Sequence, residues 1–139
     1  MLPTYLEHFQ EIKKHPFGEI SDTKVDWNRE FEELAVDKSV NPVDWIIPGE
    51  SAAYEQLEKF ISERLDNYDK DRNDPNTKGQ SDLSPYLHFG QISAQRVALE
   101  VEKYKMTGGN ATSADAFLEE LIVRRELSDN FCFYNPNYD

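Results

Sequence analysis

Two serines and a proline stand close together near the middle of the sequence. Ser81 and Ser84 flank Leu83, and Pro85 follows directly. Proline is favoured at the first position of a helix, and serine at a helix start offers a hydroxyl that caps the backbone or contacts a ligand. A helix start also exposes N–H groups at the positive end of the helix dipole. The run therefore predicts a helix start that can bind an anion such as phosphate, although such a hydroxyl more often only caps its own helix.

Two further groups of polar residues lie on predicted helices. Tyr68 and Arg72 are four residues apart at the end of one helix, where the ring suits the core and the cation suits the negative end of the dipole. Glu119 and Glu120 lie in a helix rich in Glu and Arg, where a carboxylate ordinarily pairs with a cation four residues away. Taken alone, these residues have ordinary structural roles.

The composition excludes several classes of function. No apolar run is long enough to cross a bilayer, and no signal peptide opens the chain. Cys132 is the only cysteine, and His8, His15 and His88 lack the spacing of a zinc site. We therefore expect neither a disulfide nor a metal site, and a cytoplasmic, intracellular protein.

The charge distribution limits how the chain can bind nucleic acid. Its net charge of −12 argues against general affinity for a phosphate backbone, which depends on clustered Lys and Arg. The acidic excess lies mainly in residues 1–69. The second half carries four arginines that can form a local positive site in an acidic molecule: Arg72, Arg96, Arg124 and Arg125.

Apolar spacing of three and four residues predicts an all-α fold with long connectors, and no segment alternates as a β-strand does. The clearest helix begins at Ser51 and presents an apolar face from Tyr54 to Tyr68. Other helix starts are expected at Pro3, Asp26, Ser84, Ser93 and Ser113. The loops 73–79 and 107–112 are rich in turn-forming residues.

Two further expectations concern packing. The last helix should turn its inner face to the core with Phe117, Leu118, Leu121, Ile122 and Phe131. The connector 41–50 contains too much proline for a helix, and its Trp45, Ile46 and Ile47 are expected to attach the loop to the core.

Together these motifs resemble the flavin-binding domain of DNA photolyases, most closely the class II cyclobutane pyrimidine dimer type. The resemblance rests on Ser81–Ser84 and the residues to Gly90, on Tyr68 with Arg72, and on the runs 117–127 and 129–139. It implies that residues 1–50 are an interdomain connector with short helices. Residues 51–139 would be the N-terminal half of the helical FAD-binding catalytic domain.

The resemblance also implies a role for each site residue. The residues expected to bind FAD are Tyr68, Ser81, Leu83 and Ser84. Arg72 would face the damaged DNA, and Glu120, with Glu119 as a rival, would contact the flipped pyrimidine dimer and act in its repair. In this family light drives an electron from reduced FAD to the dimer, whose ring splits before the electron returns.

The sequence also departs from the family in ways that leave alternatives open. Val123 stands where the class I pattern has tryptophan, and neither the light-harvesting domain nor the later helices with the remaining flavin contacts are present. We therefore expect a fragment that is inactive, lacks flavin and self-associates through exposed apolar faces. A cryptochrome-like photoreceptor and a stand-alone helical interaction module are the alternatives. Arg72 and Glu120 favour repair, because both face the lesion in the enzymes.

Overall fold

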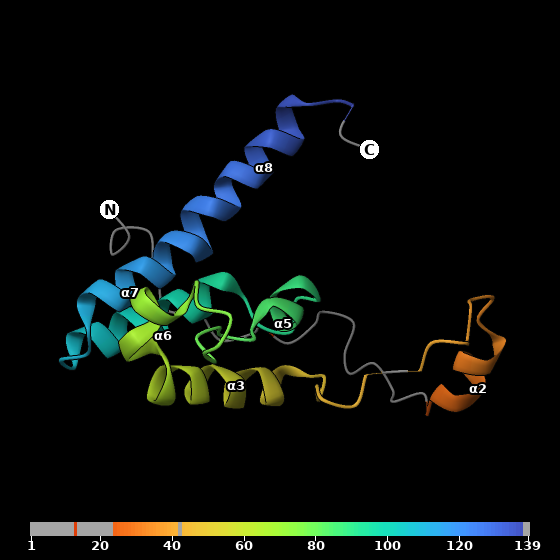
Figure 1. Ribbon diagram of the computed structural model, residues 1–139. Helices are drawn as coiled ribbons and strands as arrows, with labels where there is room; N and C mark the ends of the chain where they lie inside the picture. The colour runs from red at the N-terminus through yellow and green to blue at the C-terminus, as the bar shows by residue number, and fades with distance from the viewer. Residues whose placement is uncertain (1–12, 14–23, 42, 138–139) are drawn as a thin grey trace. The chain divides into compact units, whose positions relative to one another are not determined.

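The computed structural model of the chain describes residues 13, 24–41 and 43–137. These residues form two compact units, one within residues 7–46 and one that includes residues 47–137. Within the described ranges the regular structure is entirely helical, without a β-strand, which confirms the all-α prediction (Figure 1). The division into a connector and a flavin domain at residue 50 stays a prediction.

The first unit contains one described helix, α2 (Trp27–Glu33). Asp26 caps it as the sequence predicts, because its carboxylate accepts a hydrogen bond of 3.2 Å from the N–H of Arg29. Trp27, Phe31 and Leu34 are exposed within this unit. The helix expected near Pro3 and most of the connector 15–25 lie outside the described residues.

The second unit opens with α3 (Glu50–Glu63), which begins one residue before Ser51 and follows Gly49. The single long helix predicted up to Tyr68 is wrong. The backbone leaves helical geometry at Arg64, where φ is −129°, and continues as the 3₁₀ turn η1 (Leu65–Asn67) and the short helix α4 (Tyr68–Asp71). Leu65 and Tyr68 are buried despite this break. The sequence therefore predicts these two core positions correctly but wrongly places them in one continuous helix.

The core of this unit lies where α3 and α4 meet α6 (Ala94–Met106) and α7 (Ala111–Leu118). Three aromatic rings form its centre. Phe60 lies 5.7 Å from Tyr68 and 4.8 Å from Phe117, and Tyr68 lies 5.3 Å from Phe117 in an edge-on arrangement. Each such pair contributes about 0.5–1.5 kcal/mol beyond the apolar area it buries. The cluster thus fixes where α4 and α7 stand relative to α3.

The caps of α6 and α7 test two of the predicted helix starts. Ser93 caps α6 as expected, because its hydroxyl accepts from the N–H of Arg96 at 3.1 Å. The prediction that Ser113 caps the last helix is wrong, because α7 begins two residues earlier behind Asn110, whose side chain accepts from Thr112 and Ser113. Ser113 is instead buried, and its hydroxyl donates to the Asp69 carboxylate at 2.5 Å.

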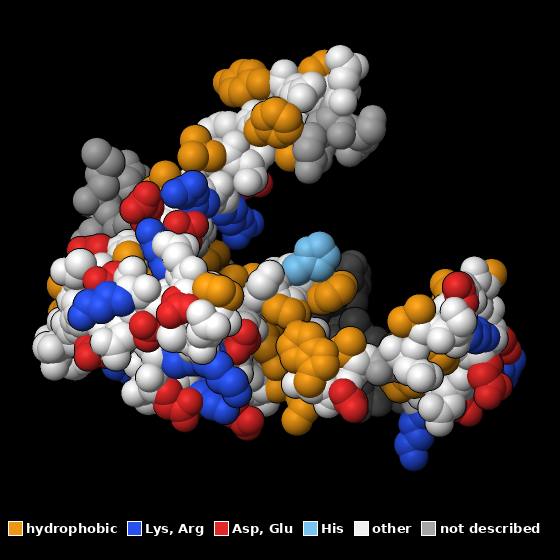
Figure 2. Space-filling model, in the orientation of Figure 1, with side chains coloured by type: hydrophobic (Ala, Val, Ile, Leu, Met, Phe, Trp, Pro, Cys, Tyr) orange, Lys and Arg blue, Asp and Glu red, His pale blue; other side chains and the backbone are white. Residues whose placement is uncertain are grey.

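The chain continues from α7 through the π-helical segment η2 (Glu119–Arg124) into α8 (Arg125–Tyr134). Leu121 and Ile122 pack against the core as predicted, whereas the expectation that Phe131 faces the core is wrong, because its side chain is exposed. No residue of α8 is buried, because this helix extends away from the core instead of lying along it (Figure 1). The space-filling view shows apolar side chains at the surface of α8 (Figure 2).

The connector before α3 is attached differently from the prediction. Trp45 and Ile47 are exposed rather than packed in a core. What holds this end of the connector is its backbone, since the buried Tyr86 donates its hydroxyl to the carbonyl of Ile47 at 3.0 Å. No helix in the described ranges is long and apolar enough to cross a membrane.

Candidate functional site

The turn that carries the two serines lies directly before α5 (Ser84–His88). Pro85 stands at the start of this helix, as the sequence predicts. Ser81 accepts a hydrogen bond of 3.3 Å from the N–H of Leu83, which occupies the N-cap position of α5. Ser84 is the first residue of the helix and is exposed, so its hydroxyl is available to a ligand. Because α5 has only five residues, its dipole is small and the hydroxyls are the stronger feature of this turn.

The loop before this turn returns closely against α4. A Cβ atom added to Gly79 would lie 2.5 Å from the backbone carbon of Asp71, so only glycine fits at this approach. Gln80 strengthens the contact by donating its side-chain amide to the carbonyl of Arg72 at 2.6 Å. The loop 73–79 therefore brings the serine turn beside the helix that carries Tyr68 and Arg72.

Tyr68 is buried between two rings of the aromatic cluster, with 6% of its surface exposed. Burial raises the pKa of its phenol, and the nearby carboxylate of Glu120 raises it further, although Arg72 opposes both effects. The phenol therefore stays protonated over the physiological pH range.

Arg72 and Glu120 form an ion pair of 2.9 Å between α4 and η2. Both side chains are partly buried, with 25% and 36% of their surfaces exposed. A second cation, Arg124, lies 3.7 Å from the same oxygen of Glu120. The Nε of Arg72 is buried without a hydrogen-bond partner in the described part of the chain. The pair thus holds a carboxylate at the surface of η2 with two cations beside it.

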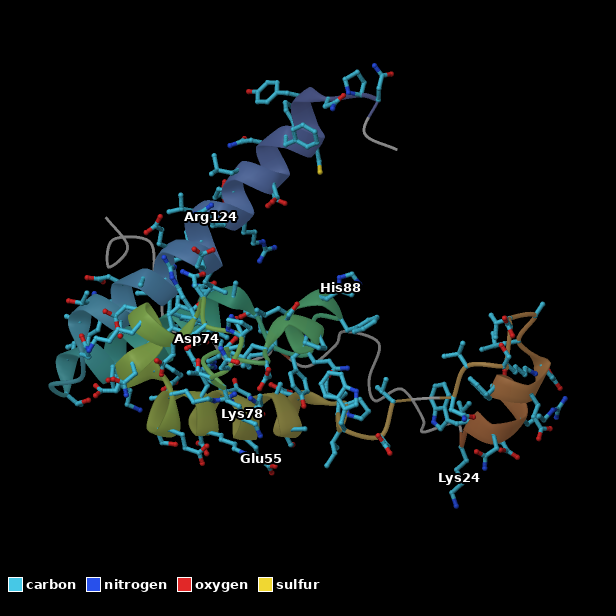
Figure 3. All side chains as sticks on the ribbon, viewed as in Figure 1. Lys24, Glu55, Asp74, Lys78, His88 and Arg124 are labelled. Atoms are coloured by element: carbon cyan, nitrogen blue, oxygen red, sulfur yellow. The ribbon has the colours of Figure 1, made fainter. Side chains whose placement is uncertain are left out.

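A cavity of about 710 Å³ brings most of these residues together. This volume lies within the range typical of sites for small molecules and cofactors. The residues that line it come from six helical elements (α4, α5, α6, α7, η2 and α8) and the turn before α5: Tyr68, Ser81, Ser84, Leu87, His88, Ala94, Phe117, Glu120, Leu121, Arg125 and Ser128. Figure 2 shows the hollow between α8 and α5, and Figure 3 labels His88 on α5 and Arg124 where η2 continues into α8.

The sequence-predicted site residues divide into three groups. Tyr68, Ser81, Ser84 and Glu120 all line this one cavity. Arg72 does not line it and reaches it only through its ion pair with Glu120. Leu83 does not line it either, because its side chain is fully buried in the core and anchors the turn instead.

The structure also separates the two candidate carboxylates of η2. Glu120 lines the cavity, whereas Glu119 is exposed and does not contribute to its wall. Adjacent residues of a helix point in different directions, so at most one of them can face a given site. Of the two carboxylates, only Glu120 faces the cavity, and its role stays a prediction.

Sequence reasoning missed several residues of the cavity wall. Arg125 and Ser128 come from α8 and join Glu120 and Leu121 on one side of the cavity. Phe117, Leu121, Arg125 and Ser128 follow steps of four, four and three residues, so helical spacing was the signal that could have placed them on one face. Leu87 and His88 belong to the motif, but the sequence analysis assigned them no role. The signal was available, because a helix that starts at Ser84 places both residues on its first two turns.

The chemistry of this wall is mixed. Hydroxyls of three serines, the carboxylate of Glu120 and the cation of Arg125 stand beside the apolar surfaces of Leu87 and Phe117. Such a wall can bind a ligand that has both a flat apolar part and a charged part. No group of three or more His, Cys, Asp or Glu side chains suited to a metal ion occurs among the described residues.

Comparison with known proteins identifies the chain. It is 46% identical over 139 residues to a protein of Potorous tridactylus named deoxyribodipyrimidine photo-lyase, with 99% of this chain matched. It is 47% identical to a protein of the same name from Arabidopsis thaliana, with 100% of this chain matched. Cryptochrome-1 of Sinapis alba is 36% identical over 64% of this chain and 19% of its own length. No model of a protein family matches the sequence.

The chain belongs to the photolyase and cryptochrome family. Its curated relatives at 44–47% identity over nearly the whole chain are all named deoxyribodipyrimidine photo-lyase. The chain spans 26% of the length of the Potorous protein and 29% of the Arabidopsis one. The family resemblance inferred from the motifs is thereby confirmed.

Proposed function

We propose that this segment belongs to a class II DNA photolyase, which splits cyclobutane pyrimidine dimers in ultraviolet-damaged DNA with light. The observation that carries the proposal is the single cavity lined by Tyr68, Ser81, Ser84 and Glu120. These four residues were singled out from motifs that lie far apart in the sequence. Their meeting in one wall is what a shared site for cofactor and lesion requires.

The flavin part of the site would be formed by the serine turn and the aromatic cluster. Ser81 and Ser84 offer hydroxyls to a diphosphate, and Tyr68 with Phe117 offers an apolar wall to a ring system. Leu83 would act through its buried side chain, which holds the backbone of the turn in place. Reduced FAD, when bound here, would supply the light-excited electron for repair. The residues themselves bind, orient and shield this group from water.

The lesion part would be formed by the ion pair of Arg72 and Glu120. A cation beside a carboxylate provides both a donor and an acceptor for a flipped pyrimidine base. Arg72 would also meet a phosphate of the damaged strand, since Arg binds phosphate well. A net charge of −12 makes such a local cation more important, because the rest of the segment repels DNA.

A cryptochrome-like photoreceptor is the second candidate, because Cryptochrome-1 of Sinapis alba and Cryptochrome-2 of Arabidopsis thaliana also match part of the chain. Their identities are 36% and 35%, below the 44–47% of the three photo-lyases that match nearly the whole chain, and over a shorter stretch. A photoreceptor would bind FAD without splitting dimers. The outcome of a repair assay therefore distinguishes the two.

The test uses the complete protein that contains this segment. Purified protein is analysed for flavin content and incubated with dimer-containing DNA in the dark and under blue or near-ultraviolet light. We expect about one FAD per chain and loss of dimers only in the light. Bound FAD without repair would favour the photoreceptor, and a protein without flavin affinity would contradict both. A fluorescent fusion would test the proposed cytoplasmic or nuclear location.

A further inference from the structure

The turn that carries Ser81 and Ser84 is held by α3, although at least 18 residues of chain separate the contacts. Gln56 donates its side-chain amide to the carbonyl of Ser81 at 2.8 Å. Arg64 forms an ion pair of 2.7 Å with the carboxylate of Asp82. Both donors lie on one helix or at its end, so α3 fixes two successive residues of the turn.

Asp82 needs such support because of its backbone conformation. Its φ is +58°, the only positive value outside glycine in the described residues. L-residues other than Gly reach this left-handed region at a cost, and Asp and Asn tolerate it best. A free turn would therefore sample other conformations, and each would move the hydroxyls of Ser81 and Ser84.

Arg64 is placed for this task by the break in the helix. It is the residue at which α3 ends, where φ of −129° directs the chain away from the helix axis. Its side chain is only 13% exposed, and its Nε is buried without a hydrogen-bond partner in the described part of the chain. The same guanidinium lies 5.9 Å from the centre of the Phe60 ring. A cation held this firmly presents a fixed donor to Asp82.

We propose that Arg64 and Asp82 are positioning residues of the cavity: their ion pair holds the serine turn in the shape that brings Ser81 and Ser84 into its wall. The functional part of this inference depends on the proposed binding of FAD at this turn. Neither residue lines the cavity, so neither is expected to contact the ligand. They act on it through the backbone of residues 81–84.

A simpler role for Arg64 is to cover Phe60, and a double-mutant cycle separates the two roles. Covering the ring does not involve Asp82. If this were the role of Arg64, the effects of Arg64→Ala and Asp82→Asn on the stability of the turn would be additive. If the pair acts as a unit, the double variant will be little worse than either single variant. Asp82→Asn keeps a residue that tolerates positive φ, so it removes the charge without adding backbone strain.

The first measurement follows the turn itself. Hydrogen exchange is measured in the complete protein without added flavin, on the peptide that contains residues 80–87. We expect Arg64→Ala to speed exchange of these amides about five- to tenfold, since a charge-assisted hydrogen bond is lost at a partly exposed site. Arg64→Lys should restore part of the protection. The control is Lys103→Ala, which removes an equal charge from an exposed pair with Glu100 on α6.

The second measurement follows the flavin. We expect Arg64→Ala to weaken FAD binding by about tenfold and to change the visible circular dichroism of the bound flavin, with partial recovery in Arg64→Lys. Unchanged exchange in the Arg64→Ala variant, or strictly additive effects in the cycle, would overturn the inference. A third outcome separates the inference from the proposed function. If Arg64→Ala speeds exchange but the wild-type protein does not bind FAD, the positioning of the turn is upheld and the proposed function is refuted.

Discussion

Arg72 and Glu120 are 48 positions apart in the sequence, and their side chains meet at 2.9 Å. Arg72 also donates to the carbonyl of Ala116 at 3.5 Å, so one arginine connects α4 to both α7 and η2. This contact links the two motifs that the sequence analysis treated separately. It makes Glu120 a carboxylate with a fixed orientation at the cavity wall.

The first prediction concerns Arg72. In the complete protein, Arg72→Ala should weaken binding to dimer-containing DNA by about 1–3 kcal/mol, because a charged hydrogen bond in a partly desolvated site is lost. Flavin content should stay unchanged, since Arg72 does not line the cavity. Affinity is measured by titration of labelled duplexes with and without a dimer.

Arg124→Ala is the matched control for this variant. Arg124 lies 3.7 Å from Glu120 but is 61% exposed, so its removal should cost less than about 1 kcal/mol in lesion affinity. Loss of flavin in Arg72→Ala would mean that this residue serves the cofactor and that its assignment to the lesion is misplaced.

Ser84 provides a test of the flavin site. Ser84→Ala should lower FAD occupancy with little change in the free energy of unfolding, because Ser84 is exposed and the N-cap position of α5 belongs to Leu83. Loss of one hydrogen bond to a charged phosphate corresponds to about 1.5–3 kcal/mol in flavin affinity. Ser62→Ala is the control, since its hydroxyl only bonds the carbonyls of Glu58 and Lys59 on α3. Equal flavin loss in both variants would contradict the role of Ser84.

The buried phenol of Tyr68 predicts a pH dependence of stability. Burial raises its pKa above the ordinary value near 10, with a smaller contribution from Glu120. The unfolded chain therefore loses this proton first as the pH rises. The stabilisation is complete below about pH 10 and decreases as the pH rises through the folded-state pKa.

Urea unfolding at about pH 8 and about pH 10.5 measures this effect, on either side of the ordinary tyrosine pKa. Wild type should lose more stability over this interval than Tyr68→Phe. The pKa of Tyr104 is raised as well, chiefly by burial, but Tyr104 is present in both proteins and cancels in the comparison. Identical pH dependence of the two proteins would show that Tyr68 is not buried as a phenol.

The sequence predicted the helical class and the helix caps well where the determinants are local. Asp26 and Ser93 cap helices because a side-chain oxygen needs only a neighbouring N–H two or three residues on. Ser113 was assigned wrongly because Asn110 is an equally good cap three residues before it. The competing positions have nearly the same local energy, and tertiary burial of Ser113 against Asp69 decided between them.

The parts that spacing failed to predict depend on irregular backbone. The break at Arg64 and the π turn at η2 both change the phase of a helix, and neither has a local sequence signal such as proline. The contact of Arg72 with Glu120 could be anticipated only from the family resemblance. Arg125 was anticipated only as one of four arginines that can form a local positive site, and the contribution of Ser128 to the cavity was not anticipated at all.

The exposed face of α8 predicts how the 139-residue chain behaves alone. Leu127, Phe131, Phe133 and Tyr134 each expose more than half of their surface on α8. Exposed apolar surface of this kind drives association. We expect light scattering to show oligomers that dissociate in Leu127→Glu, and weak or absent FAD binding by flavin fluorescence. A strict monomer at high concentration, or a stoichiometric submicromolar complex with FAD, would contradict these two expectations.

The repair yield of two neighbouring variants tests the central assignment most directly. Glu120 lines the cavity and pairs with Arg72, whereas Glu119 is exposed outside its wall. The quantum yield of light-driven dimer splitting is measured for Glu120→Gln and Glu119→Gln in the complete protein at saturating DNA. We predict a lower yield in Glu120→Gln with nearly unchanged lesion affinity, and a normal yield in Glu119→Gln. Normal repair by Glu120→Gln, or no light-dependent repair by the FAD-bound wild type, would contradict the account.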